Sequence, residues 1–155
     1  MTVTARFEAK DDGFDLMLGD RLILRHRVDS PAFRIAKGNP AVTMVRGNFR
    51  HQDTPSDERV LRYVLKWVEP QNGYGEVFLS DEPSGALLLK LLVSEHDNSL
   101  SVDRCPQGDG YDRLTVEFLA GPDETVWGGG EQMSYLALNG RNFPIWTSEP
   151  GVGRE

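Results

Sequence analysis

The sequence predicts an all-β protein built from antiparallel strands. Turn residues recur at short intervals, and short apolar or alternating segments lie between them, as is typical of strands joined by tight turns. The segment 86–93 is almost continuously apolar, which indicates a strand buried on both faces. The chain has 155 residues, which suits one hydrophobic core. We therefore expect an antiparallel β-sandwich.

The first predicted hairpin spans residues 14–28. Apolar and polar positions alternate on both sides of Gly19-Asp20, and this dipeptide is suited to a turn. The apolar positions are Phe14, Leu16 and Leu18 before the turn and Leu22 and Leu24 after it.

Further strands are expected along the middle of the chain. The segments 75–79 and 86–93 flank the turn-rich residues 80–85 and predict a second strand pair. Asp97-Asn98 then turns the chain into a strand over 99–102.

The last predicted strands lie before the glycine-rich region. Leu114, Val116 and Phe118 alternate with polar residues, which predicts a strand, and a short strand is expected over 124–127.

The segment 60–68 fits two interpretations. Leu61, Tyr63, Leu65 and Trp67 share one face of a strand, whereas Leu61, Val64, Leu65 and Val68 share one face of a helix. Ser56-Asp57 could cap such a helix. We favour the strand, because the neighbours are strands and the segment is rich in β-branched and aromatic residues.

Composition and charge exclude several partners. The formal net charge is -7, with 24 acidic and 17 basic residues, which argues against nucleic acid and anionic membranes as partners. No apolar stretch is long enough to span a bilayer, and the first ten residues do not resemble a signal peptide. The single cysteine, Cys105, cannot form an internal disulfide, which favours a reducing, cytoplasmic location.

Few residues stand at spacings that carry chemistry. His26, His51 and His96 are scattered, so neither a metal site nor another cofactor site is predicted, and each histidine is expected at the surface or in a strand. Nucleophile motifs are absent, and the many carboxylates cannot be paired from the sequence.

The glycine-rich run 128–130 is the most distinctive feature. No Lys-Ser or Lys-Thr follows it, which excludes a phosphate loop. A tight turn explains the glycines by themselves. They also let the backbone approach a ligand closely, and Glu131 and Gln132 would then offer groups that suit sugar hydroxyls. We divide the chain accordingly into a β-sandwich domain, 1–126, and a glycine-rich loop and junction segment, 127–155.

The residues from Trp127 onward resemble a known enzyme family. The run Trp127-Gly-Gly-Gly-Glu-Gln-Met-Ser-Tyr135, with the later Asn139-Gly-Arg-Asn-Phe-Pro-Ile-Trp146 and the ending through Arg154, is similar to a segment of glycoside hydrolase family 31. The Glu-Gln pair and the Trp-Thr-Ser-Glu-x-Gly-x-Gly-Arg ending resemble its sulfoquinovosidase branch. The first 120 residues resemble the family only in their β-rich character.

The resemblance implies a galactose-mutarotase-like β-sandwich at the amino terminus of a larger retaining α-glycosidase. In the family a catalytic (β/α)₈ barrel, which carries the two catalytic Asp residues, follows this domain. This chain would then hold no catalytic residue and be inactive alone. Glu131 and Gln132 match the loop that reaches the sugar pocket, and Trp146 and Arg154 would lie at the pocket or domain junction.

The partners implied are the sugar substrate, an α-sulfoquinovoside, and the barrel. A surface shaped for the barrel would leave an apolar patch on the fragment and favour self-association. Two other functions stay open behind this one: a stand-alone carbohydrate-binding module, and a scaffold without sugar affinity.

Overall fold

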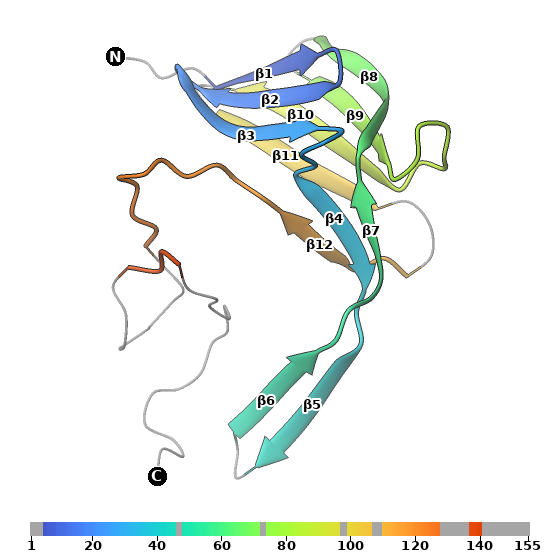
Figure 1. The fold of residues 1–155 in the computed structure, drawn as a ribbon, viewed down its shortest axis with the longest axis vertical. Coiled ribbons are helices and arrows are strands. Elements are labelled where there is room, and N and C mark those ends of the chain that lie inside the picture. Colours follow the sequence, from blue (N-terminus) through green and yellow to red (C-terminus); the bar gives the residue numbers. More distant parts are fainter. Residues whose placement is uncertain are drawn as a thin grey trace. The chain divides into compact units, whose positions relative to one another are not determined.

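The structure is a computed structural model that describes residues 5–45, 48–71, 74–96, 99–106, 110–127 and 137–140 (Figure 1). Within these ranges every regular element is a β-strand, and the strand registers are antiparallel. The all-β prediction is therefore confirmed. The chain divides into two compact units, Met1–Pro40 with Asp53–Leu119, and Ala41–Gln52 with Ala120–Glu155.

The first unit contains three antiparallel sheets. Their strand orders are β1-β2-β3, β11-β10-β9-β8 and β12-β4-β7. In chain order the strands are β1 Ala5–Lys10, β2 Gly13–Leu18, β3 Arg21–Arg27, β4 Phe33–Lys37, β7 Ser56–Leu61, β8 Tyr63–Gln71, β9 Tyr74–Ser80, β10 Leu89–His96, β11 Ser99–Pro106 and β12 Arg113–Val116.

The β1–β3 sheet packs on the β8–β11 sheet (Figure 1), and the core between them extends to residues of the β12-β4-β7 sheet. The ring of Phe7 on β1 stacks on that of Trp67 on β8, with 4.3 Å between the centroids. Burial of each large apolar side chain contributes about 1.5–3 kcal/mol to stability. The buried cluster comprises Phe14, Leu16, Leu24, Ala32, Phe33, Ile35, Leu61, Val77, Leu79, Leu89 and Leu91.

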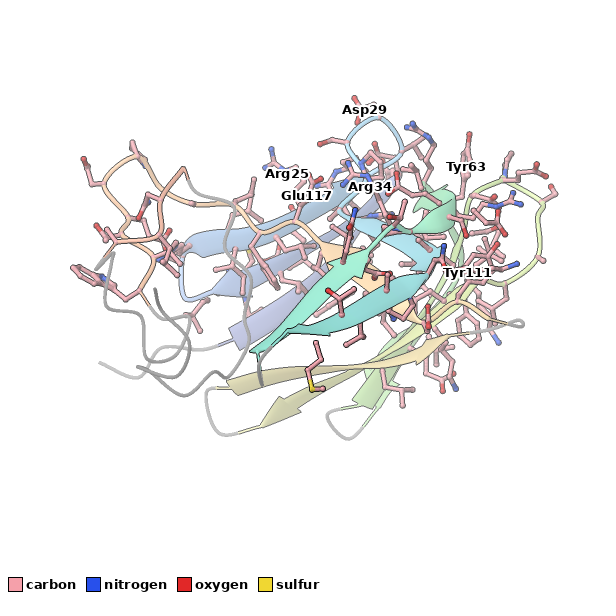
Figure 2. The ribbon with its side chains drawn as sticks, turned by 90° about the horizontal axis from the view of Figure 1, so that it is seen from below. Arg25, Asp29, Arg34, Tyr63, Tyr111 and Glu117 are labelled. Carbon is pink, nitrogen blue, oxygen red and sulfur yellow. The ribbon has the colours of Figure 1, made fainter. Side chains whose placement is uncertain are left out.

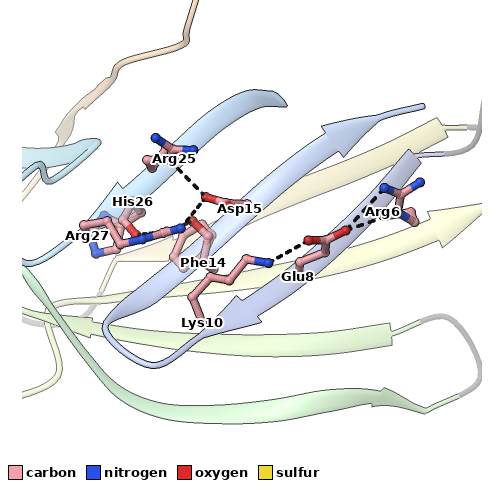
Figure 3. Close-up of polar contacts among 8 residues, drawn as sticks. All are labelled: Arg6, Glu8, Lys10, Phe14, Asp15, Arg25, His26 and Arg27. Carbon is pink, nitrogen blue, oxygen red and sulfur yellow. Dashed lines mark hydrogen bonds and ion pairs between the residues drawn. The ribbon is translucent and has the colours of Figure 1, made fainter. Parts of the chain in front are cut away.

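The outer face of the β1–β3 sheet is held by charges (Figure 3). The side chain of Asp15 is only 9% exposed, and its Oδ1 lies 2.9 Å from Nη2 of Arg27. Arg27 Nη1 also donates to the backbone carbonyls of Phe14 and His26, at 2.8 and 2.7 Å. One guanidinium therefore neutralises a buried carboxylate and satisfies two carbonyl groups, which joins β2 to β3.

The β12-β4-β7 sheet contains an irregularity at Asp57. The register between β4 and β7 shifts between Ile35 and Lys37, and Asp57 has a φ of 50°, a left-handed conformation that non-glycine residues rarely adopt. Its carboxylate is bound by Lys37 Nζ at 3.0 Å, Arg59 Nε at 2.9 Å and the Tyr111 hydroxyl at 3.1 Å. These contacts hold the pKa of Asp57 below its ordinary value, Lys37 foremost.

A hairpin of the second unit, β5 Pro40–Val45 with β6 Asn48–Asp53, is inserted between the neighbouring strands β4 and β7. The residues at its ends are tied together within the first unit. Asn39 N donates to Asp53 Oδ1 at 2.8 Å, and Thr54 N donates to Asn39 O at 3.4 Å. Asp53 also pairs with Arg113, so the residues that flank the hairpin are held together within the first unit.

The chain beyond β12 continues to pair without forming a regular strand. Glu117 N donates to Ala32 O, and Leu119 N donates to Ile23 O, both at 2.9 Å. Figure 2 shows Arg34 beside Glu117, with which it forms an ion pair. This segment therefore covers part of the β3 edge.

Most predicted strands are confirmed, including the hairpin 14–28 and the pairing of 99–102 with the preceding strand. The segment 60–68 belongs to β7 and β8, so the helical interpretation is wrong. Ser56-Asp57 begins a strand and caps no helix.

Three details of the prediction are wrong. The strand expected over 86–93 begins at Leu89, and Leu89 and Leu91 are buried while Leu92 on the other face is only half-buried. Phe118 lies beyond β12 and is 67% exposed. Residues 124–127 form no strand, because their backbone groups are hydrogen-bonded to the side chain of Asn139 and to Leu138 N.

Candidate functional site

The residues predicted to form the site, Glu131, Gln132, Trp146 and Arg154, lie outside the described residues. The described parts nearest to them in the chain are 120–127 and 137–140. Both belong to the second unit. They directly precede and follow the segment 128–136, which carries Glu131 and Gln132. We call the residues 120–127 and 137–140 together the base of this segment.

The base begins with a turn over Gly121-Pro122-Asp123-Glu124. Glu124 N donates to Gly121 O at 3.1 Å, and Gly121 N donates to Glu124 Oε2 at 3.0 Å. Proline at the second position of such a turn has its φ already restricted to the required value. The side chain and the backbone of Glu124 therefore both fix the direction in which the chain enters 125–127.

The two sides of the base are joined through Asn139. Its Oδ1 accepts a hydrogen bond from Val126 N at 2.8 Å, and its Nδ2 donates to Glu124 O at 2.6 Å. Leu138 N donates to Val126 O at 2.9 Å. Gly140 follows with a φ of 69°, a left-handed conformation that favours glycine.

The base is apolar where the chain reaches 128. Val126 is 46% exposed and Trp127 is 60% exposed. A large exposed indole beside a segment with carboxylate and amide groups suits contact with a sugar face or with another protein surface.

Sequence reasoning placed Asn139 in the family-like motif but gave it no role. The signal was available, because Asn-Gly favours a turn with a left-handed residue, and an Asn side chain often satisfies backbone groups. The partners of that side chain, thirteen and fifteen residues earlier, could not be read from the sequence.

His26 is the histidine with a described side chain, and it lies in the core. It is 0% exposed, and its Nδ1 accepts a hydrogen bond from Ala32 N at 3.2 Å. Burial lowers its pKa to about 4, with the charge of Arg27 acting in the same direction. A neutral, enclosed imidazole of this kind supports the fold and does not reach a ligand.

An open depression of about 380 Å³ lies on the first unit, between the β1–β2 turn and β8. Its polar walls include Asp11, Asp12, Tyr63 and Lys66. Asp12 is already paired with Arg27 Nε at 3.2 Å. Among the described residues no group of three or more His, Cys, Asp or Glu could hold a metal ion, and no helix is long and apolar enough to cross a membrane.

The resolved carboxyl pKa shifts are downward. The pKa of Asp53 is lowered by Arg113 and then by the backbone of Asn39, and that of Glu8 is lowered by Lys10 and Arg6. With Asp57 this makes three carboxylates kept in the ionised form by neighbouring hydrogen-bond donors and cations. Such groups stabilise the fold as ion pairs. A general acid needs the opposite shift.

Two sulfoquinovosidases are similar to this chain in sequence. A sulfoquinovosidase of Agrobacterium fabrum is 40% identical over 149 residues, which are 96% of this chain and 21% of the relative. A sulfoquinovosidase of Escherichia coli is 31% identical over 159 residues, covering 96% of this chain and 22% of the relative. No family model matches the chain.

A solved structure agrees with the sequence relatives. It is a GH31 family sulfoquinovosidase from E. rectale in complex with an aza-sugar inhibitor, with 30% sequence identity and a TM-score of 0.81 over 97% of this chain and 21% of that chain. The present chain thus spans about a fifth of the length of the curated relatives it matches. The chain is homologous to sulfoquinovosidases over nearly its whole length, and its antiparallel β fold matches part of a GH31 family sulfoquinovosidase, which is consistent with an amino-terminal β-sandwich domain of that family.

Proposed function

We propose that this chain is the non-catalytic amino-terminal domain of a retaining α-glycosidase that hydrolyses α-sulfoquinovosides. Its task is to support the sugar pocket, to which it contributes the segment 128–136. The catalytic carboxylates belong to a barrel elsewhere in the longer enzyme. The observation that carries the proposal is the 40% identity to a sulfoquinovosidase across 96% of this chain but only 21% of the relative.

The ion pairs of the described residues support the non-catalytic role. Retaining glycosidases need two carboxyl groups about 5–5.5 Å apart, one of them able to donate a proton. Asp53 and Asp57 are instead engaged by Arg113 and by Lys37 with Arg59. Each of these carboxylates would have to break its ion pair before it could act on a substrate.

The apolar surface of the second unit supports its packing against another part of the enzyme. All buried core residues among the described residues belong to the first unit, whereas the second unit exposes Val42, Met44, Val126 and Trp127. A two-stranded hairpin is marginal in water by itself. Contact with the barrel would remove these side chains from solvent.

In the proposed pocket, Glu131 and Gln132 contact sugar hydroxyls through a carboxylate acceptor and an amide. Trp146 and Arg154 line the pocket or the domain junction. This assignment rests on the match of these positions to the motif of the family.

The test compares this chain with the chain extended through its downstream reading frame, using a chromogenic α-sulfoquinovoside. We expect cleavage by the extended protein and none by the 155-residue chain. Glu131→Ala in the extended protein should lower kcat/KM, whereas Glu58→Ala, at an exposed position of β7, should not. Activity of the 155-residue chain, or an unchanged kcat/KM after Glu131→Ala, would overturn the proposal.

A further inference from the structure

We propose that the depression between the β1–β2 turn and β8 is a binding site for a neutral ring compound with several adjacent hydroxyl groups, such as a hexopyranoside. All the residues that line it belong to the first unit and to the part of the chain that the structure describes. Binding there requires no catalytic residue, so this proposal does not rest on the proposed function.

The depression has the size of a small-molecule site. Its volume of about 380 Å³ lies within the range of roughly 300–1,000 Å³ that is typical of ligand pockets. One wall is formed by residues 9–13, at the end of β1, the turn and the start of β2. The other wall is formed by residues 63–67 of β8, and Val28 completes the lining. One six-membered ring with its substituents suits a concavity of this size.

The β8 wall contains a β-bulge. In the pairing of β8 with β9, Val64 lies opposite Leu79 and Lys66 lies opposite Phe78, so Leu65 is an extra residue without a partner position. Leu65 is also one of the residues that line the depression. Bulges are common at sheet edges and beside binding sites, where they redirect a side chain.

The bulge changes the direction of Trp67. In a regular strand, residues an odd number of positions apart lie on opposite faces. Val64 and Trp67 are three positions apart, yet both pack against the core. The extra residue between them therefore turns Trp67 toward the β1–β3 layer, where its ring stacks on that of Phe7 and contributes apolar surface to the depression.

The position of β8 in its sheet favours a compact ligand. The sheet order is β11-β10-β9-β8, so β8 is an edge strand, and within the described residues no strand pairs with its other edge (Figure 1). An edge strand presents unpaired backbone N–H and C=O groups. A further strand would need a regular register, which the bulge interrupts, whereas a small ligand needs only one or two of these groups.

The charges around the depression favour a neutral ligand. Two lining residues are basic and two are acidic: Lys10, Lys66, Asp11 and Asp12. The Nζ of Lys10 lies 2.8 Å from a carboxylate oxygen of Glu8 (Figure 3), and a carboxylate oxygen of Asp12 lies 3.2 Å from Nε of Arg27. Asp11 forms no ion pair with any described residue. With equal numbers of both signs in the lining, a strongly charged ligand would meet repulsion as well as attraction.

Adjacent hydroxyl groups match the remaining polar groups. A hydroxyl both donates and accepts hydrogen bonds, a carboxylate only accepts, and an ammonium group only donates. Asp11 would accept from one hydroxyl, Lys66 would donate to another, and the Tyr63 hydroxyl can do either. The C–H groups of the ring would lie against the indole of Trp67, which leaves the hydroxyls for the polar wall.

The experiment is a titration of the ¹⁵N-labelled 155-residue chain with methyl α-D-glucopyranoside, followed through the backbone amide signals in NMR spectra. We expect saturable shifts that are concentrated in residues 10–13 and 63–67. The Kd should be about 1 mM or weaker, as for an open site and a ligand of about thirteen non-hydrogen atoms. Tetrahydropyran, which has the ring without the hydroxyls, should give no saturable shifts.

Two matched variants test the role of the free carboxylate. Asp11→Ala removes a charged acceptor at an exposed position of the β1–β2 turn, and the Kd should rise about tenfold or more. Asp20→Ala removes the same charge at an exposed position of the β2–β3 turn, outside the lining of the depression. This control should keep the wild-type Kd. Equal Kd values for the wild type and Asp11→Ala, or an equal loss in both variants, would contradict the proposal.

Hydrogen exchange of the extended protein gives a second measurement that does not depend on how the 155-residue chain folds alone. We expect the glucoside to slow the exchange of residues 63–67. If these amides are already protected without the sugar and the sugar adds nothing, another part of the enzyme covers β8 and the proposal is wrong. Shifts confined to residues outside the lining would overturn it as well. Neither result bears on cleavage of the α-sulfoquinovoside, so the proposed function is tested separately.

Discussion

The imidazole of His26 lies face to face with the ring of Phe14, with 5.0 Å between the centroids and 22° between the planes. Phe14 in turn stacks on Phe7, and Phe7 on Trp67, at 4.8 and 4.3 Å. A titratable ring thus belongs to the aromatic stack that joins the two layers of the sandwich. The core therefore contains a group whose protonation destabilises the folded state.

The first prediction is that acid destabilises the fold through His26. The unfolded chain binds a proton with a pKa near 6.5 and the folded chain only near 4, so stability is fully present above pH 6.5 and is lost as the pH falls toward 4. We expect the unfolding free energy to fall by roughly 2 kcal/mol between about pH 7.5 and about pH 5. Urea denaturation at the two pH values measures it.

The His26→Asn variant is the control for this prediction. It keeps an acceptor near the position of Nδ1 for the Ala32 N–H and does not titrate in this range. Its unfolding free energy should depend much less on pH. An equal dependence in both proteins would assign the acid sensitivity to other groups.

Gly13 is predicted to be intolerant of a side chain. A Cβ at this position would collide with the backbone carbonyl of His26 on β3, and backbone atoms cannot move aside without breaking the β2–β3 pairing. We expect Gly13→Ala to destabilise the chain by about 3 kcal/mol. At Gly121 a Cβ would meet nothing closer than the Cβ of Glu124 at 3.9 Å, so Gly121→Ala should be nearly neutral in the same thermal and denaturant unfolding experiments.

Removing one partner of the ion pair between Asp15 and Arg27 should lower the free energy of unfolding strongly. Arg27→Ala leaves a carboxylate whose side chain is 9% exposed with Arg25, at 3.7 Å, as its remaining cation, and it also removes the donor for two carbonyl groups. The expected loss is about 3 kcal/mol, read from denaturant midpoints. Asp12→Asn removes a second partner of Arg27 that is 56% exposed and should cost less than about 1 kcal/mol. A loss after Asp12→Asn as large as after Arg27→Ala would mean that burial does not set the cost.

Self-association of the isolated chain should depend on the β5 strand. Val42 and Met44 are 53% and 65% exposed, and their spacing places them on one face of the strand. The double variant Val42→Lys with Met44→Lys should lower the weight-average mass in sedimentation experiments over a range of concentrations. Leu18→Lys, on the first unit and 40% exposed, should leave the mass unchanged. Equal effects of the two changes would show that any added charge suffices.

The sequence predicted strands where alternating residues flank a clear turn, but it did not predict β1, β4, β5 or β6. Gly19-Asp20 with alternating residues on both sides predicted the first hairpin, which is confirmed. The segment 60–68 was ambiguous because Leu61 and Leu65 satisfy both periods, and the pairing of β8 with β9 decides it. Local residues favoured both interpretations, and only the neighbouring strands distinguished them.

Contacts between residues that are far apart in the sequence were not predicted. The burial of His26 depends on Phe14 and Phe33, and the left-handed conformation of Asp57 depends on Lys37 and Tyr111. The strand expected over 124–127 failed for the same reason, since the side chain of Asn139 takes the place of a strand partner there. The four predicted site residues, which include Glu131, remain predictions.

The closed ends of the β5–β6 hairpin make it an interchangeable module. Asn39 and Asp53 are hydrogen-bonded at its base, and the β4–β7 register on the far side of that bond is set by other residues. The length and composition of the hairpin can therefore change without destabilising the β-sandwich. In a lineage of proteins that share this domain, the hairpin is where surface properties can diversify while the core stays the same.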